Sequence, residues 1–267
     1  MPEPTPPAPS PALPRLLLIW LPPLLLLAAA GALLQQNTNT PLFLALNSGA
    51  AMLPASFWSW VTVLGTGACA YAVVAPTLKN TPRLMASALL TGAFAGSFTH
   101  TIKPLVDAGR PAAMFDPSQI HIIGETLTRN SFPSGHATTA FAFAATLVFF
   151  GRRPALLASV LLPLAALVAF SRIAVGAHWP LDVLVGAAGG WLSGAAGEAI
   201  SRRWMVWQKL TMQAVMALAL LVMGISLAGT DLGYPLADPL KWLLSGVAVG
   251  SAIVALRAIW LKRSAAA

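Results

Sequence analysis

Long uninterrupted apolar stretches constrain this chain more than any other feature of its sequence. They cover about residues 15–34, 56–76, 84–103, 135–150, 155–171, 181–199, 211–229 and 241–261. A helix crosses the hydrocarbon core of a bilayer with roughly 20 apolar residues. Charged residues make up 9% of the 267 residues, too few to cover the surface of a soluble domain. The sequence therefore predicts an all-α fold, a polytopic membrane helix bundle of eight helices.

The predicted helices fall into two groups behind a short N-terminal tail. Residues 1–14 are Pro-rich, and we expect a disordered cytoplasmic tail there. Residues 15–199 carry six helices, and residues 200–267 carry two further transmembrane helices and a short tail. Residues 37–55 mix Asn with apolar residues and are expected at the membrane interface. The first run ends in AAAGA like a signal-peptidase site, but the long Pro-rich lead favours a retained helix.

The distribution of cations predicts the orientation in the membrane. The formal net charge is +8, from 16 Lys and Arg against 8 Asp and Glu. If the N-terminus is cytoplasmic, eleven cations lie on or near that face: Arg15, Lys79, Arg83, Arg152, Arg153, Arg202, Arg203, Lys209, Arg257, Lys262 and Arg263. Five lie on the other face: Lys103, Arg110, Arg129, Arg172 and Lys241. Because cytoplasmic loops are enriched in Lys and Arg, we expect both termini in the cytoplasm.

Two other classes of interaction are not indicated. No Lys/Arg-rich run with interleaved aromatic residues occurs, so the positive charge does not predict nucleic-acid binding. The single cysteine, Cys69, lies within an apolar run and cannot form an intramolecular disulfide. The positive charge is therefore interpreted through membrane topology alone.

Three polar clusters stand at ends of apolar runs that share the non-cytoplasmic face. They are Lys103 to Pro111 (KPLVDAGRP), Pro133 to His136 (PSGH), and Ser171 to Asp182 (SRIAVGAHWPLD). The first and third clusters follow helices that run outward, and the second begins a helix that runs inward. Their convergence on one face predicts a composite site.

The cations and the helix start in these clusters suit a bound phosphate. Lys103, Arg110 and Arg172 place three positive charges beside hydrocarbon, where unpaired charge is expensive. A phosphate satisfies them, since Arg offers bidentate forks and Lys a point charge. Ser134 is the expected N-cap of a helix that starts near Gly135, whose backbone N–H groups would face the anion. The cations repel a divalent metal, so we expect no metal site and no cofactor.

Two histidines and a carboxylate in the same clusters suit covalent catalysis. Asp182, four residues after His178, can accept the Nδ1–H of the imidazole and leave Nε2 free to attack phosphorus. His136 can donate a proton to the leaving oxygen and then activate water. The fixed cations can stabilise charge on the phosphoryl oxygens in the transition state.

The three clusters resemble the signature of the phosphatidic acid phosphatase type 2 (PAP2) superfamily, which also contains acid phosphatases and vanadium haloperoxidases. Its pattern is K-x6-RP, PSGH and SR-x5-H-x3-D, and the chain matches all eleven specified positions in order. The resemblance implies a six-helix core over residues 15–199. It also implies that His178 is the nucleophile, Asp182 its partner and His136 the acid. The phosphate-binding residues would be Lys103, Arg110, Ser134, Gly135 and Arg172.

The resemblance and the position of the site predict a membrane enzyme of the bacterial type. We expect it to hydrolyse a lipid phosphate or pyrophosphate at the periplasmic or exterior face of the inner membrane, through a phosphohistidine. Candidate substrates are undecaprenyl pyrophosphate, phosphatidylglycerophosphate and phosphatidic acid. Two alternatives stay open: transfer of the phosphoryl group to an acceptor lipid, and a non-catalytic lipid transporter that keeps the fold. The expected partners are the lipid substrate and the bilayer.

Overall fold

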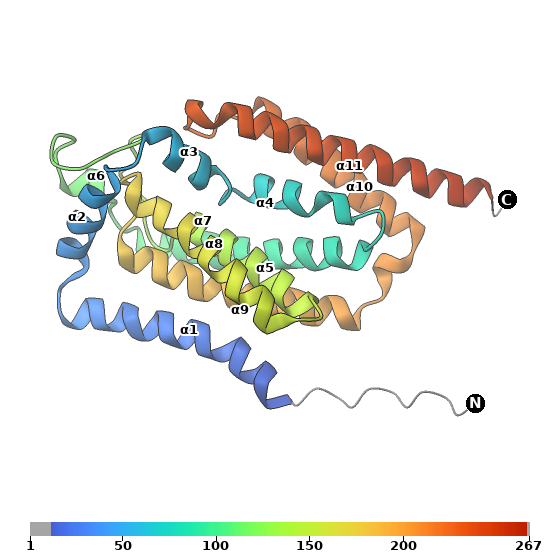
Figure 1. The fold of residues 1–267 in the computed structure, drawn as a ribbon, viewed down its shortest axis with the longest axis horizontal. Helices are drawn as coiled ribbons and strands as arrows, with labels where there is room; N and C mark the ends of the chain where they lie inside the picture. The colour runs from blue at the N-terminus through green and yellow to red at the C-terminus, as the bar shows by residue number, and fades with distance from the viewer. Residues whose placement is uncertain (1–11, 266–267) are drawn as a thin grey trace.

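The computed structural model describes residues 12–265, and every regular element among them is a helix. Figure 1 shows long helices lying roughly side by side in one bundle. The elements are α1 (Ala12–Gln35), α2 (Asn39–Ala50), α3 (Ala55–Val63), α4 (Gly67–Val74), η1 (Ala75–Thr77), α5 (Pro82–Val106), α6 (Pro111–Met114), α7 (Gly135–Phe150), α8 (Pro154–Ala174), α9 (Pro180–Arg203), η2 (Val206–Gln208), α10 (Leu210–Gly229), η3 (Pro235–Ala237) and α11 (Asp238–Ser264). The predicted all-α membrane fold is confirmed.

The longest helices have the length and composition of membrane spans. Five segments meet both conditions: α1, α8, α9, α10, and η3 together with α11. The bent pair α3 and α4 adds a sixth. The apolar α7 is shorter, with 16 residues, and packs together with the 25-residue α5 against α9. The chain is therefore a multi-pass membrane protein.

The tightest packing in the bundle is between α7 and α9, because α9 presents glycine where the two backbones approach. A Cβ at Gly190 would lie 2.2 Å from the carbonyl oxygen of Thr138, and one at Gly194 would lie 2.4 Å from that of Ala142. Small residues allow this approach between membrane helices, where packing replaces the hydrophobic effect as the main attraction. Beside this contact, Trp191 is fully buried and meets the ring of Phe149 edge to face.

The expected helix over residues 56–76 is wrong as a single element, since it breaks into α3 and α4 with a bend of 70°. The break covers Leu64, Gly65 and Thr66, the backbone of Thr66 is extended, and Gly67 begins α4. Two glycines weaken a helix at this point. A Cβ at Gly65 would lie 2.9 Å from Cβ of His136. The break therefore brings backbone directly against a predicted catalytic histidine.

Two boundaries near the N-terminus also differ from expectation. The helix α1 begins at Ala12 and not at residue 15, because a proline at position 14 is tolerated in a first helical turn. Residues 1–11, the rest of the expected tail, lie outside the described residues. The stretch 37–55 contains the helix α2, which buries Phe43, Asn47 and Ala50 along one face. A spacing of three to four residues between buried positions is helical.

The two ends of the bundle differ in what they carry. Figure 1 shows the start of α1 and the end of α11 at one end, while α2, α6 and the loop before α7 lie at the opposite end, here called the site end. Near the start of α1, Glu198 of α9 is buried and forms ion pairs with Arg15, Arg83 and Arg202. This carboxylate therefore ties α1 and α5 to α9 far from the site end.

The packing of α7 on α9 makes a specific prediction for Gly190. We expect Gly190→Ala to lower the free energy of unfolding by roughly 1–3 kcal/mol, because its methyl group has no space beside Thr138. Thermal unfolding of the purified protein in detergent measures this. Gly250→Ala on α11 is the matched control, because a Cβ there meets nothing within 4 Å. Equal melting temperatures for the two variants would contradict the prediction.

Candidate active site

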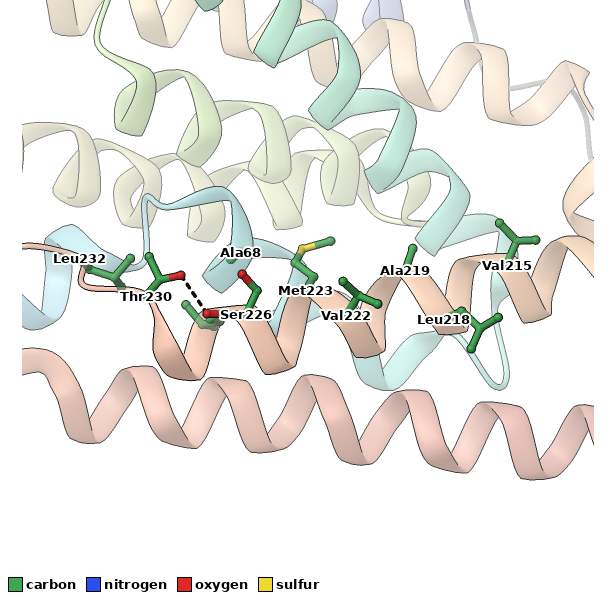
Figure 2. Close-up of a pocket in the computed structure, with 10 residues that line it drawn as sticks. Ala68, Val215, Leu218, Ala219, Val222, Met223, Ser226, Thr230 and Leu232 are labelled. Atoms are coloured by element: carbon green, nitrogen blue, oxygen red, sulfur yellow. Dashed lines mark hydrogen bonds between the residues drawn. The ribbon is translucent and has the colours of Figure 1, made fainter.

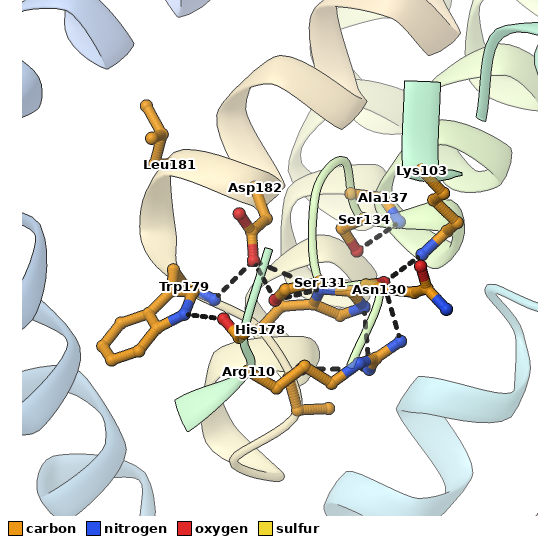
Figure 3. A network of polar contacts seen from close by, with 12 residues as sticks. Lys103, Arg110, Asn130, Ser131, Ser134, Ala137, His178, Trp179, Leu181 and Asp182 are labelled. Carbon is orange, nitrogen blue, oxygen red and sulfur yellow. Dashed lines mark hydrogen bonds and ion pairs between the residues drawn. The ribbon is translucent and has the colours of Figure 1, made fainter. Parts of the chain in front are cut away.

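The three sequence clusters meet at the site end of the bundle. Lys103 lies in the last turns of α5, Arg110 precedes α6, and Ser134 precedes α7. His178 lies in the connection between α8 and α9, and Asp182 lies in the first turn of α9. Figure 3 shows these five residues around one polar centre, where Asn130 accepts hydrogen bonds from both Lys103 and Arg110, and His178 lies between Arg110 and Asp182. The structure therefore brings the three clusters together at one end of the bundle, as the sequence predicts.

His178 and Asp182 form a buried pair. The His178 Nδ1 atom lies 3.4 Å from Asp182 Oδ2, and both side chains are at most 3% exposed. The same carboxylate oxygen accepts a hydrogen bond of 3.0 Å from the backbone N–H of Trp179 at the start of α9. Because Pro180 in the first turn has no backbone N–H, that position of the helix start needs no hydrogen-bond acceptor. Asp182 therefore orients the imidazole and caps its own helix.

Arg110 determines which nitrogen of His178 carries the proton. Its Nη1 atom lies 3.3 Å from His178 Nε2. A guanidinium can only donate, so Nε2 must present its lone pair and the proton must sit on Nδ1, facing Asp182. Burial, and then the charge of Arg110, lower the pKa of His178 well below its usual value. The imidazole is therefore neutral at pH 7, with the lone pair of Nε2 facing a cation.

Ser131 belongs to this centre and is absent from the predicted site. Its hydroxyl is fully buried and donates to Asp182 Oδ2, and it lies 3.4 Å from His178 Nδ1. The carboxylate thus has three donors around one oxygen, from Ser131, Trp179 and His178. A serine in a loop carries no local pattern that would have identified it.

Backbone carbonyls of the loop before α7 hold two of the three cations. Asn130 O accepts from Lys103 Nζ at 2.6 Å and from Arg110 Nη2 at 3.3 Å. Arg129 O accepts from Arg110 Nε at 2.7 Å, and Ala177 O accepts from Arg110 Nη1 at 3.0 Å. Burial, and then the charge of Arg172, lower the pKa of Arg110 to about 10, so it stays charged at pH 7.

Arg172 is held differently, by hydroxyl groups. Its Nη1 atom donates to Thr62 Oγ1 at 2.6 Å and to Tyr234 Oη at 2.8 Å. The residue is 2% exposed, and its Nε atom is buried without a hydrogen-bond partner in the described part of the chain. Neither hydroxyl residue is in the predicted site, because Thr62 lies in an apolar run and Tyr234 lies in the C-terminal extension.

The PSGH cluster begins α7 as expected. Ser134 is the N-cap, and its Oγ accepts from Ala137 N at 3.4 Å. Its own N–H donates to the carbonyl of Asp182 at 3.0 Å, which joins α7 to α9 at the site. Gly135 and His136 follow in the first turn and line a cavity of about 370 Å³ with Gly65 and Thr139. The imidazole of His136 makes no hydrogen bond to any described residue.

The charges that surround His178 also act on His136. The guanidinium groups of Arg172 and Arg110 and the ammonium of Lys103 lie within electrostatic range of both imidazoles. The two histidines and the three cations therefore belong to one electrostatic environment, as a composite site requires.

A second, larger hollow of about 620 Å³ lies elsewhere, along α10 (Figure 2). Its lining is almost entirely aliphatic, with Ser226 and Thr230 as its polar residues, which hydrogen-bond to each other along the helix. None of the predicted site residues reaches it. The cavity beside His136 is smaller but is the one that adjoins the polar centre.

Asn47 of α2 positions the segment around the centre and was not predicted. Its Nδ2 group donates to the carbonyls of His121, Ile173 and Ala174 at 2.8, 3.0 and 3.2 Å. Its Oδ1 accepts from the backbone N–H of His121 at 2.7 Å. One buried amide therefore links α2 and the loop at residue 121 to the end of α8, just after Arg172.

The described residues contain no group of three or more His, Cys, Asp and Glu side chains arranged to hold a metal ion. Among the described residues, Asp182 is the carboxylate that hydrogen-bonds within the polar centre, and its Oδ2 atom is engaged by three donors. The donor set of the centre therefore suits an anion better than a cation.

Known proteins are similar to this chain in sequence and in fold. Residues 84–212 match the model of the PAP2 superfamily. Escherichia coli YbjG is 40% identical over 81 residues, covering 30% of this chain and 37% of that protein. The lipid A 1-phosphatase of Rhizobium etli is 36% identical over 113 residues, covering 39% of this chain and 44% of that protein. The chain thus spans less than half the length of these curated relatives.

Two solved structures share the fold. Aquifex aeolicus LpxE aligns with a TM-score of 0.53 and 26% identity, over 62% of this chain and 95% of that chain. A transmembrane PAP2-type phosphatidylglycerolphosphate phosphatase from Bacillus subtilis aligns with a TM-score of 0.52 and 18% identity, over 70% of this chain and 97% of that chain. The second likeness concerns the fold alone.

The importance of the donor group of Asn47 can be tested by replacing its amide with a carboxylate, which can only accept. We expect Asn47→Asp to lower the free energy of unfolding by more than about 2 kcal/mol, because a carboxylate would face three carbonyl oxygens. Asn39→Asp is the control, since Asn39 only accepts, from Leu181 N at the start of α9, where a negative charge is favourable. Thermal unfolding in detergent measures both. A loss of the same size in both variants would refute the assignment.

Proposed function

We propose that the chain, whose residues 84–212 match the PAP2 superfamily, hydrolyses a lipid phosphate or pyrophosphate through a phosphohistidine on His178. The observation that carries this proposal is the contact between His178 Nε2 and Arg110 Nη1. It places the lone pair of a neutral, buried imidazole beside a cation that can bind the oxygens of the phosphoryl group under attack.

The first half of the reaction is attack on phosphorus. The substrate phosphate takes over the Arg110 donor that now faces Nε2, and Nε2 then forms a bond to phosphorus. The bond from phosphorus to the ester or anhydride oxygen breaks at the same time. Asp182 stabilises the positive charge that develops on the imidazole, through Nδ1–H. Lys103, Arg110 and Arg172 bind the phosphoryl oxygens, and no metal ion is needed to neutralise them.

The second half releases phosphate. His136, protonated when the bound phosphate offsets the nearby cations, donates that proton to the leaving oxygen in the first step. In the second step the neutral imidazole accepts a proton from the water that attacks phosphorus. The bond between phosphorus and Nε2 then breaks, which restores neutral His178. Ser134 and Gly135 contribute the N-terminal end of α7, which favours the anion throughout.

The cavity beside His136 supports a lipid as the substrate. It is lined by small and aromatic residues of α4, α5 and α7, including Tyr71, Ala95 and Phe143. A phosphate at the polar centre can therefore continue into apolar surroundings. We propose an isoprenyl or glycerolipid chain there, with undecaprenyl pyrophosphate, phosphatidylglycerophosphate and phosphatidic acid as candidates.

The arrangement of the bundle supports the proposed orientation. The start of α1 and the end of α11 lie at the same end of the bundle, opposite to the site (Figure 1). With the cation-rich connections in the cytoplasm, the site faces the periplasm or exterior of a bacterial inner membrane, and both termini are cytoplasmic.

Hydrolysis is tested by phosphate release from the purified protein with isoprenyl and glycerolipid phosphates. We expect release by the wild type in the presence of EDTA, and a loss of at least about 10³-fold in His178→Ala, because the nucleophile is gone. Trapping the phosphorylated protein with labelled substrate would locate the phosphate on His178. Unchanged rates in His178→Ala would overturn the proposal, and label on a second lipid with little free phosphate would indicate phosphotransfer.

The role of His136 is tested by the leaving group. We expect His136→Ala to slow hydrolysis of an alkyl phosphate by roughly 10²–10⁴-fold, because the departing alkoxide needs a proton. An aryl phosphate with an acidic leaving group should form phosphohistidine at a nearly normal rate in the same variant, as measured by a burst of released phenol. Equal slowing of this burst and of the alkyl reaction would exclude His136 as the general acid.

A further inference from the structure

The two C-terminal helices return to the polar centre through the segment that connects them. This segment, residues 230–237, is here called the C-terminal strap. Trp60 Nε1 of α3 donates to Leu236 O at 2.8 Å, and Lys241 Nζ donates to Thr230 O at 3.1 Å. A Cβ at Gly124 would lie 2.3 Å from the carbonyl oxygen of Gly233, so the strap rests directly on the loop before α7. Contacts with Trp60 of α3 and with Gly124 in the loop before α7 therefore hold the strap at the site end.

Tyr234 is the strap residue that enters the protein. It is 7% exposed and packs in one apolar cluster with Trp58, Ile123 and Val175. Its hydroxyl accepts the 2.8 Å hydrogen bond from Arg172 Nη1, and the guanidinium carbon lies 5.8 Å from its ring centroid. The aromatic ring anchors the strap, and the hydroxyl reaches a predicted phosphate-binding cation.

The hydrogen bonds of Arg172 are confined to one part of its guanidinium. Both hydroxyl partners, Thr62 and Tyr234, accept from Nη1. Nε is buried without a partner, and Nη2 makes no hydrogen bond to any described residue. The edge formed by Nε and Nη2 is the one that binds a phosphate with two parallel hydrogen bonds. The two hydroxyls therefore hold Arg172 through Nη1, which leaves Nε and Nη2 for a phosphate.

The chemistry of the anchor matters because a carboxylate in the place of Tyr234 would compete with phosphate. An ion pair would neutralise Arg172, whereas a phenol hydroxyl accepts a hydrogen bond and leaves the charge available. Losing the hydroxyl leaves Thr62 as the single anchor of a buried guanidinium. The free edge would then be less well oriented toward the anion.

We propose that Tyr234 is a positioning residue for phosphate binding, and that the C-terminal helix pair completes the active site by presenting it to Arg172. The inference deepens the proposed function, on which it rests for the role of Arg172. It assigns a role to helices that lie beyond the expected six-helix core. The ligand at the free edge is a phosphoryl group, whichever lipid carries it.

The test is Tyr234→Phe in the full chain, which keeps the ring and removes only the hydroxyl. The probe is orthovanadate, followed by the increase in melting temperature that it produces and by inhibition of phosphate release. We expect the apparent vanadate affinity to fall roughly tenfold, as for loss of one hydrogen bond to a charged group. The KM for lipid phosphate should rise by a similar factor. Vanadate affinity equal to the wild type would overturn the proposal.

Ser245→Ala is the matched control within the same helix pair. It removes a buried hydroxyl that donates to Gly224 O at 2.6 Å and has no contact with the polar centre. We expect this variant to lose some thermal stability but to bind vanadate as the wild type does. Weaker vanadate binding by the same factor in Ser245→Ala would show that Tyr234 acts only through general stability.

A double mutant separates action through Arg172 from any other effect. If Tyr234 works by orienting Arg172, then Tyr234→Phe should cause no further loss of vanadate affinity in an Arg172→Gln background. Additive losses would overturn the proposal. The vanadate-dependent melting temperature needs no turnover, so it tests the role of Tyr234 even if the wild type releases no phosphate from any lipid. That last result alone would refute the proposed function.

Discussion

The structure depends on one electrostatic constraint, the concentration of three cations around a neutral histidine at the end of a membrane bundle. Arg110 and Arg172 are buried and Lys103 is partly buried, while the carboxylate of Asp182 pairs with His178 in the same centre. Burying positive charge in this way costs free energy unless the cations donate hydrogen bonds and bind an anion. The loops at the site end are folded to supply those hydrogen bonds, and the proposed substrate supplies the anion.

The partners of the cations are mostly neutral, which preserves their charge. Lys103 and Arg110 donate to backbone carbonyls, and Arg172 donates to two hydroxyls. At the opposite end of the bundle, by contrast, Arg15, Arg83 and Arg202 share the carboxylate of Glu198. Arginines therefore stabilise the fold at the end where Glu198 neutralises them. At the site end, where their partners are neutral, they remain suited to binding an anion.

The general fold and the membership of the polar centre could be predicted because both follow from local patterns. Apolar runs indicate membrane helices wherever the chain lies in the bundle, and each motif keeps its spacing in the sequence. The break at Gly65 was missed because hydropathy stays high through it, and α2 was missed because Asn47 and its neighbours look interfacial. The proposed roles of His178 and His136 and the division at residue 199 stay predictions.

The residues that could not be predicted share a physical reason, which is that their partners are tertiary. Each of these residues uses one side chain whose hydrogen-bond partner lies far away in the sequence, on another element or loop. They are Asn47, Thr62, Ser131 and Tyr234. Asn47 is the extreme case, since it is 127 residues from Ala174, and Tyr234 is 62 residues from Arg172. A division of the chain into a core and a C-terminal pair describes its sequence well. It does not divide the interactions, because the hydrogen bond from Arg172 to Tyr234 crosses that boundary inside the polar centre.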